Sequence, residues 1–174
     1  MAQFYNARHI STSSDYQIQE TQWFEIVVEG IEDLTFLVQS CSLPDSSNSA
    51  VAVPYGNSTA YVAGKREYNT NTFTFMDAIK ADIEGQLLQW QSSVYNPTNG
   101  KMGWVDEYKR TITVTEYGPN GSRERSWKFL GCWPESINYG SLTHESAGLK
   151  NISVTMRYDE VERLDSTPAT TGNN

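Results

Sequence analysis

Residues 71–94 read NTFTFMDAIKADIEGQLLQWQSSV, and this stretch passes directly from a strand pattern into a helix pattern. Phe73 and Phe75 alternate with threonine, which predicts a strand with one buried face. Asp77 is a suitable N-cap for a helix over residues 77–94, and the Asn-Pro-Thr-Asn-Gly run that follows would end it. One apolar stripe follows the helical period and contains Ile79, Ile83, Leu87, Trp90 and Val94. We therefore expect a single helix that lies against a sheet.

Alternating apolar and polar residues on both sides of this stretch predict an antiparallel β domain. Before it, one strand is expected at residues 23–29, and a second strand with Leu34, Phe36 and Val38 follows a turn at residues 30–33. After it, further strands are expected around residues 111–115, 126–133 and 151–158. The predicted fold class is mainly β (α+β), an antiparallel β-sandwich or half-barrel with one flanking α-helix.

The length of 174 residues suits one domain, which the patterns place at residues 23–163. Residues 45–64 within it have strand propensity but too little apolar bulk to fill a core, so we expect a long projecting arm or loop. Segments of this length in compact domains usually serve interactions. Residues 1–22 are expected to form an N-terminal arm, and the Ser/Thr/Gly/Asn-rich residues 164–174 a flexible C-terminal tail.

The formal net charge of −8 disfavours nucleic-acid binding through phosphate contacts, which require clustered lysine and arginine. The charge is uneven, since residues 23–70 carry six acids and two bases whereas residues 110–128 carry two acids and four bases. Opposite charges on different segments favour self-association between unlike surfaces, and a solvated acidic surface is the alternative. The polar faces of several strands are rich in threonine, serine and asparagine, which suits either a barrel wall that meets confined water or a solvent-facing sheet.

No arrangement of residues in the sequence indicates catalysis, a cofactor or a metal site. The two histidines, His9 and His144, have no partner at ligand spacing. No signal peptide and no run of about 18 apolar residues is visible, so we expect no membrane partner. Cys41 and Cys132 are either small, partly buried apolar side chains or partners in a disulfide within or between subunits. The chain is therefore expected to be a structural protein and not an enzyme.

A set of short motifs follows one another along the chain. They are FLVQSCSLP at 36–44, VP at 53–54, VAGKR at 62–66, FTFMD at 73–77, WQS at 90–92, and GCWP at 131–134 ahead of the strand at 152–158. In this order the chain resembles the tail tube proteins of contractile-tailed bacteriophages over residues 23–161. The resemblance implies hexameric rings in which four strands of each subunit join a shared inner β-barrel. Stacked rings would form a hollow tube that conducts double-stranded DNA during genome ejection.

The resemblance also suggests roles for particular residues. The projecting arm would reach a neighbouring ring, with the contact candidates Val53, Pro54, Tyr55, Tyr61, Lys65 and Arg66. The candidates that line the lumen are Thr111, Thr113, Thr115 and Glu116. The acidic chain would give DNA a wall that repels it, so that DNA passes transiently and without specific binding.

The implied partners are further copies of the chain, the tail sheath, tape measure, baseplate and tail terminator proteins, and DNA in transit. The implied location is the virion tail, after assembly in the host cytoplasm, with no cofactor. Two alternatives stay open. One is the tube of a related injection device, such as a type VI secretion or bacteriocin-like system, and the other is a monomeric β-sandwich binding module with tyrosine-rich loops.

Overall fold

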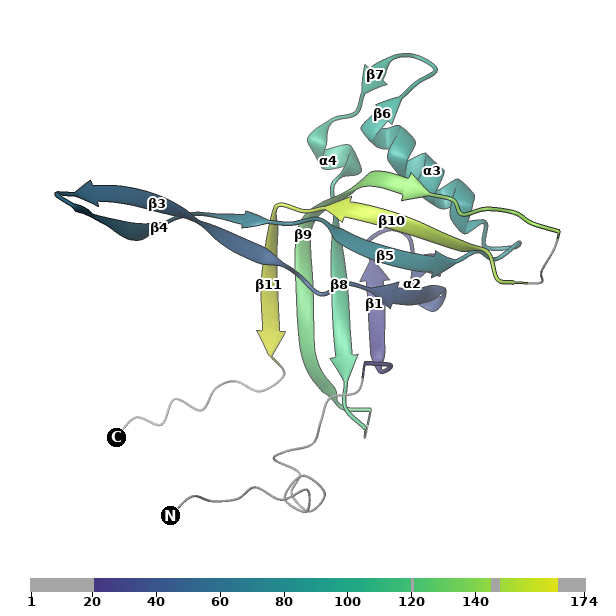
Figure 1. The fold of residues 1–174 in the computed structure, drawn as a ribbon. Helices are drawn as coiled ribbons and strands as arrows, with labels where there is room; N and C mark the ends of the chain where they lie inside the picture. Colours follow the sequence, from purple (N-terminus) through teal and green to yellow (C-terminus); the bar gives the residue numbers. More distant parts are fainter. Residues whose placement is uncertain (1–20, 120, 145–147, 166–174) are drawn as a thin grey trace.

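The structure is a computed structural model that describes residues 21–119, 121–144 and 148–165. Two antiparallel sheets pack against each other and share the long strand β9 (Arg123–Asn138). Sheet A has the order β1-β8-β9-β11 and contains β1 (Phe24–Val28), β8 (Arg110–Tyr117), the first part of β9, and β11 (Glu160–Asp165). Sheet B has the order β9-β10-β5-β2 and contains the second part of β9, β10 (Asn151–Arg157), β5 (Asn71–Met76) and β2 (Val38–Cys41). Figure 1 shows the strands of sheet A running from top to bottom and those of sheet B running across them.

The core lies between the two sheets and is built from the apolar faces of their strands. Ile26, Ile112 and Phe129 contribute from sheet A, and all three are buried. Phe73 of sheet B meets Phe129 edge to face, with 6.2 Å between the ring centroids and 78° between the ring planes. Aromatic pairs in this arrangement stabilise a core beyond the area that they bury. The antiparallel sandwich expected from the sequence is confirmed.

Residues 33–36 form a short helix, α2 (Asp33–Phe36), where the sequence pattern predicted a strand. Leu34 is buried, whereas Phe36 is 82% exposed. Side chains two residues apart share a face in a strand but point to different sides of a helix, which explains this split. The prediction of one strand face with Leu34, Phe36 and Val38 was therefore wrong, and β2 starts only at Val38.

The flanking helix α3 (Ile83–Val94) is shorter than the sequence predicted. Its N-cap is Asp82, which has a left-handed backbone with φ of +45° and accepts a hydrogen bond from Gly85 N at 3.1 Å through Oδ1. A Cβ on Gly85 would lie 2.3 Å from the Asp82 carboxylate, so this glycine makes room for the cap. Asp77 is not the cap and Ile79 is fully exposed, so the predicted helix start was wrong. The later residues of the predicted stripe, Ile83, Leu87 and Trp90, are buried.

A β-hairpin formed by β3 (Ser46–Tyr55) and β4 (Ser58–Tyr68) projects from the sandwich on the side of β11 (Figure 1). Its two strands pair with each other and with no other described strand. At the base, Asn69 N donates to Asp45 O at 3.0 Å, and Asn69 Nδ2 donates to Asp45 Oδ2 at 2.7 Å. Most of residues 45–64, expected to form an arm or loop, lie in this hairpin.

A smaller projection, which we call the lobe, comprises residues 95–108 between α3 and β8. It contains β6 (Tyr95–Asn96), β7 (Lys101–Met102) and α4 (Val105–Tyr108). Figure 1 shows the lobe above the end of sheet A at which β8 begins.

The end of the described chain adds a strand that the sequence analysis did not predict. Because β11 runs to Asp165, the domain boundary placed at residue 163 falls inside a strand. The expected N-terminal arm and C-terminal tail lie mostly outside the described residues. Among the described residues, no helix has the length and apolarity that crossing a membrane requires.

Candidate assembly surfaces

The face of sheet A that points away from the core is polar. One row across the sheet is formed by Val27, Thr113, Lys128 and Glu162, and the next by Glu25, Thr115, Ser126 and Leu164. Tyr117 Oη donates to Glu25 Oε2 at 2.6 Å, and this hydrogen bond is the main reason why the pKa of Tyr117 is raised. Among the described residues, the strand register gives this face the acids Glu25, Glu29, Glu160 and Glu162 and the bases Arg123 and Lys128. The face therefore offers hydroxyl groups and charges of both signs, with a small excess of acid.

The structure brings together most of the residues predicted to line a lumen. Thr111 and Thr113 lie on the polar face of sheet A and are partly exposed. Thr115 lies on the same face but is only 7% exposed, and its Oγ1 accepts a hydrogen bond from Ser126 Oγ at 3.2 Å. Glu116 belongs to the opposite face, where its Oε1 accepts a hydrogen bond from Trp127 Nε1 at 3.1 Å. Simple alternation along β8 would have separated Glu116 from the three threonines.

Sheet A ends in two strands that each have a single paired neighbour within the described part of the chain. β1 pairs with β8, and β11 pairs with β9. All neighbouring strands in the sheet are antiparallel, so β1 and β11 run in opposite directions. β11 of one copy laid beside β1 of a second copy would continue the antiparallel order. Unpaired N–H and C=O groups on such edges favour strand addition.

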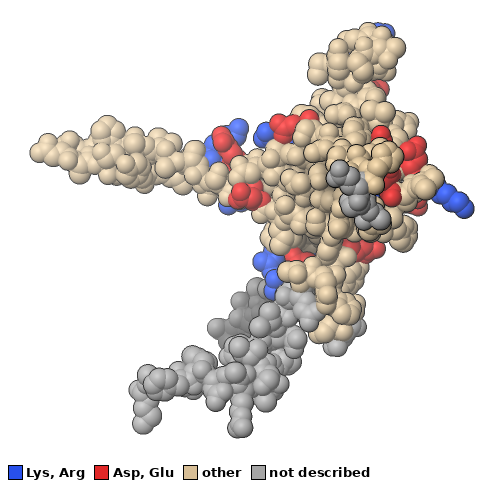
Figure 2. All heavy atoms as spheres, turned by 45° about the vertical axis from the view of Figure 1, so that its right-hand side comes forward, with Lys and Arg blue, Asp and Glu red and all other residues tan. Residues whose placement is uncertain are grey.

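The hairpin offers a long surface without charge. Residues 46–64 include no Asp, Glu, Lys or Arg, and all of them except Gly64 are exposed. Figure 2 shows the projecting hairpin without a charged side chain until its base. The predicted contact residues Val53, Pro54, Tyr55 and Tyr61 lie on the outer half, where Tyr55 is 80% and Tyr61 72% exposed.

The two predicted basic contact residues lie at the base of the hairpin, in β4. Lys65 and Arg66 are exposed, and Arg66 Nε donates to Asn48 Oδ1 across the hairpin at 3.3 Å. Ser49 Oγ donates to Lys65 O at 3.2 Å. Strand pairing thus runs along the whole hairpin, and side-chain hydrogen bonds reinforce its base.

Both cysteines are free thiols in the structure. Cys132 is buried in β9, and burial raises its pKa to about 12. Burial, followed by the charge of Glu116, raises the pKa of Cys41 in β2 to about 11. The disulfide considered from the sequence is absent within this chain, and only Cys41 is accessible enough for a bond to a second copy.

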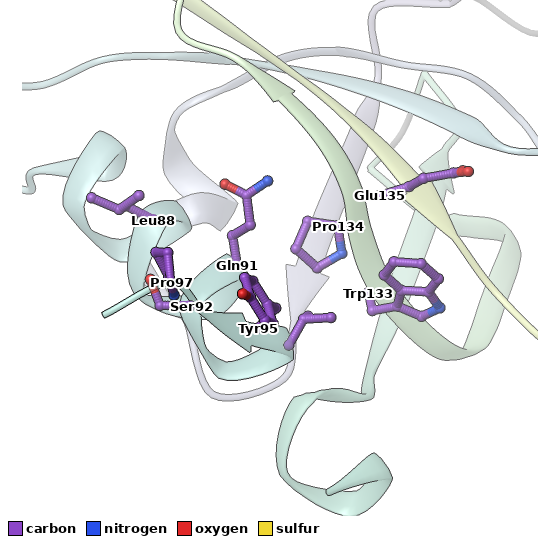
Figure 3. A pocket seen from close by; sticks show the side chains of 9 residues that line it. Leu88, Gln91, Ser92, Tyr95, Pro97, Trp133, Pro134 and Glu135 are labelled. Atoms are coloured by element: carbon purple, nitrogen blue, oxygen red, sulfur yellow. The ribbon is translucent and has the colours of Figure 1, made fainter. Parts of the chain in front are cut away.

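A shallow pocket lies between α3 and β9 (Figure 3). Tyr95, Trp133 and Pro134 give it apolar walls around about 330 Å³. Its acidic residue, Glu135, forms an ion pair with Arg157 at 3.3 Å. Within the described residues, no three His, Cys, Asp or Glu side chains gather in a way that could hold a metal ion. These surfaces are suited to protein contacts.

Comparisons of the sequence and of the fold with known proteins both identify tube proteins. A family model for the phage tail tube protein matches residues 6–162. The tail tube protein gp19 of Enterobacteria phage T4 is 24% identical over 131 residues, which cover 74% of this chain and 80% of that protein. The tube terminating cap of the anti-feeding prophage has a TM-score of 0.70 at 15% identity, covering 86% of this chain and 92% of that chain.

A further solved structure extends the match in fold. It is the sheath–tube complex of the extracellular contractile injection system PVC in the extended state. Its TM-score is 0.69 at 16% identity, and the match covers 93% of this chain and 99% of that chain. At identities this low, these two likenesses concern the fold alone. Because the family model spans most of the sequence, the chain belongs to the phage tail tube protein family, which consists of structural virion components and not enzymes.

Proposed function

We propose that this chain forms hexameric rings by head-to-tail pairing of β11 with β1 of the next copy. The observation that carries the proposal is the polar, four-stranded sheet A, whose two edge strands run in opposite directions. Repeating one such contact around a closed rotation generates a ring and leaves no strand edge open. Six copies of sheet A then form one continuous inner β-barrel, and stacked rings form a hollow tube.

In this tube the polar face of sheet A lines the lumen, because the opposite face is covered by sheet B. Thr111 and Thr113 present hydroxyl groups to the lumen, and Glu25 and Glu162 present carboxylates. Lys128 lies beside Glu162 in the strand register, so its positive charge has a close negative neighbour. A wall of this kind makes few favourable phosphate contacts and lets double-stranded DNA pass.

The hairpin connects one ring to the next. Its outer half, with Val53, Pro54, Tyr55 and Tyr61, is apolar, uncharged and exposed in the single chain. Exposed apolar surface of this extent typically marks a protein contact. Lys65 and Arg66 at its base are placed to pair with acidic side chains of the adjoining subunit.

Further tail proteins complete the assembly. The PVC structure similar in fold contains a sheath around the tube. By analogy, the outside of this tube binds a sheath, its ends bind terminator and baseplate proteins, and its lumen holds the tape measure protein before DNA. The tube of an injection device is the second candidate, because solved structures with this fold come from such devices. Packaged DNA in the particle distinguishes the phage tail from that device.

Negative-stain microscopy and size-exclusion chromatography of the purified chain test the proposal. We expect six-fold rings or tubes with a central channel. A chain that stays monomeric up to high concentration contradicts the proposal and supports the monomeric binding module.

A further inference from the structure

We propose that Trp104, in the lobe of one copy, docks into an apolar pocket at the opposite end of β8 in a copy of the next ring. This inference rests on the proposed tube and names side chains through which its rings stack. The partner is a second copy of this chain, because the protruding group and the pocket that fits it lie at the two ends of one strand.

The lobe presents Trp104 from an anchored backbone. Trp104 is 77% exposed and its neighbour Met102 is 75% exposed. Gly103 N donates to Val94 O, the last residue of α3, at 3.1 Å, and Trp104 N donates to Glu107 Oε2 at 3.0 Å. Two hydrogen bonds therefore fix the chain beneath the indole. Such a group loses little conformational entropy when it is buried against a partner.

The pocket lies at the end of sheet A where β8 ends and β9 begins, and its volume is about 370 Å³. Glu116 and Arg125, which face each other in the strand register, bring opposite charges to it. An indole suits this mixture, because its ring can pack on apolar walls, its N–H can meet a carboxylate and its face can meet a guanidinium. The apolar walls come from Trp23, Phe24, Leu43 and Val114.

The placement of the two surfaces fits stacking along a tube. The lobe leads directly into the start of β8 at Arg110, and Glu116 of the pocket lies near the end of β8. At about 3.3 Å per residue, the two ends of this eight-residue strand are about 23 Å apart. Figure 1 shows β8 running from the lobe to the opposite end of sheet A. Where sheet A forms the tube wall, the two ends of β8 would therefore lie at the two rims of the ring. Rings stacked head to tail therefore bring the lobe of one copy to the pocket of another.

The charges around the two surfaces are complementary. Asp106 and Glu107 are exposed beside Trp104. Arg123 and Arg125 are exposed at the start of β9, with the exposed Glu124 between them, and Arg125 lines the pocket. A contact of Asp106 or Glu107 with one of these arginines at the rim of the apolar contact would favour encounter in one orientation. The contact thus also gives the tube a direction.

Substitution of the indole tests the inference. In Trp104→Ala we expect six-fold rings of normal appearance and at least about a tenfold higher protein concentration for half-maximal tube formation, as for a central aromatic contact. Leu142→Ala is the matched control, since Leu142 is 87% exposed in the β9–β10 connection, and it should form tubes as the unaltered chain does. Tubes that form normally from Trp104→Ala overturn the inference and leave the ring proposal intact. An unaltered chain that forms no rings contradicts the ring proposal itself.

Cross-linking provides a second, independent measurement. Trp104→Cys combined with Leu43→Cys, in a Cys41→Ser background, should give disulfide-linked ladders on a non-reducing gel of oxidised tubes. Each substitution alone, and the pair Leu142→Cys with Leu43→Cys, should give no ladder. Absence of the ladder in intact tubes contradicts the contact.

The pocket has one competing occupant, residues 1–20 of the same chain, because Thr21 lines it. Stacking that survives Trp104→Ala but is lost on deletion of residues 2–20 assigns the pocket to that segment and overturns the inference. Stacking that survives the deletion and is lost in Trp104→Ala supports it.

Discussion

Strands β10 and β3 both pair in antiparallel order, but their environments are opposite. In β10, Ile152, Val154 and Met156 alternate with polar residues and are all buried. In β3, Val51 and Val53 alternate with alanine, and every residue of the strand is exposed. The large side chains of β10 meet those of neighbouring strands in the core, whereas β3 has only its hairpin partner.

This difference indicates that the sandwich serves folding and the hairpin serves assembly. The sandwich holds the buried apolar area on which folding depends. The hairpin keeps its shape through strand pairing and the Asp45–Asn69 hydrogen bonds, and its apolar surface stays available for a second copy. Changes in the sandwich should therefore reduce stability, and changes in the hairpin should reduce assembly.

Deletion of the hairpin should have the largest effect, and that effect should fall on assembly alone. Without residues 46–62 we expect a folded monomer or ring that forms no tubes, because the ring-to-ring connector is gone. Asp45 and Asn69 remain to close the base. Circular dichroism checks the fold and electron microscopy checks the tubes. Tubes formed by the deleted chain would remove the hairpin from ring stacking.

Phe129→Ala should have the converse effect. Phe129 is fully buried and contacts Phe73 and Tyr158, with 5.0 Å between the Phe129 and Tyr158 ring centroids. Loss of this ring should lower the free energy of unfolding by about 3–5 kcal/mol, measured by urea denaturation. The matched change in the hairpin, Tyr55→Ala, should lower it by less than about 0.5 kcal/mol, since Tyr55 is 80% exposed. Equal losses at the two positions would contradict the division between sandwich and hairpin.

Alkaline pH should act on the sandwich and not on the hairpin, because both thiols lie in the sandwich. Burial raises the pKa of Cys132 from 9.0 to about 12, so above pH 9 the unfolded chain loses a proton that the folded chain keeps. The contribution of Cys132 to stability is therefore fully present below pH 9 and is lost as the pH rises. Cys132 should contribute up to about 1.4 kcal/mol per pH unit.

Urea denaturation between pH 8 and pH 10 measures this slope. Cys132→Ala should flatten it, even though the substitution lowers stability at every pH. The hairpin-deleted chain should keep the original slope. A slope that is unchanged in Cys132→Ala would exclude this thiol as its source.

The sequence was sufficient to predict the sandwich, because the alternation of apolar and polar residues in a strand follows directly from the burial of one face. Alternation of large apolar residues predicted β5, β8 and β10, and the motif order identified the family. It was insufficient for α2, since Leu34, Phe36 and Val38 fit a strand pattern although tertiary packing selects a helical turn that buries Leu34 alone. β11 was missed because its two apolar residues, Val161 and Leu164, stand among charged residues three positions apart and do not alternate. The pocket at the end of β8 draws its residues from β1, β2, β8 and β9 and the segments beside them, so only the fold brings them together.

The smallest expected effect concerns the start of α3, where Asp77 and Asp82 are both suitable N-caps by sequence but only Asp82 caps the helix. Asp82→Ala should lower the free energy of unfolding by about 1 kcal/mol, because the cap to Gly85 is lost and alanine is strained at a φ of +45°. Asp82→Asn should be nearly neutral, since asparagine caps helices and tolerates left-handed backbone. Asp77→Ala removes an ion pair with Lys150 at 3.0 Å and should cost less than Asp82→Ala. If urea denaturation instead gives the larger loss for Asp77→Ala, the ion pair with Lys150 stabilises the fold more than the cap does.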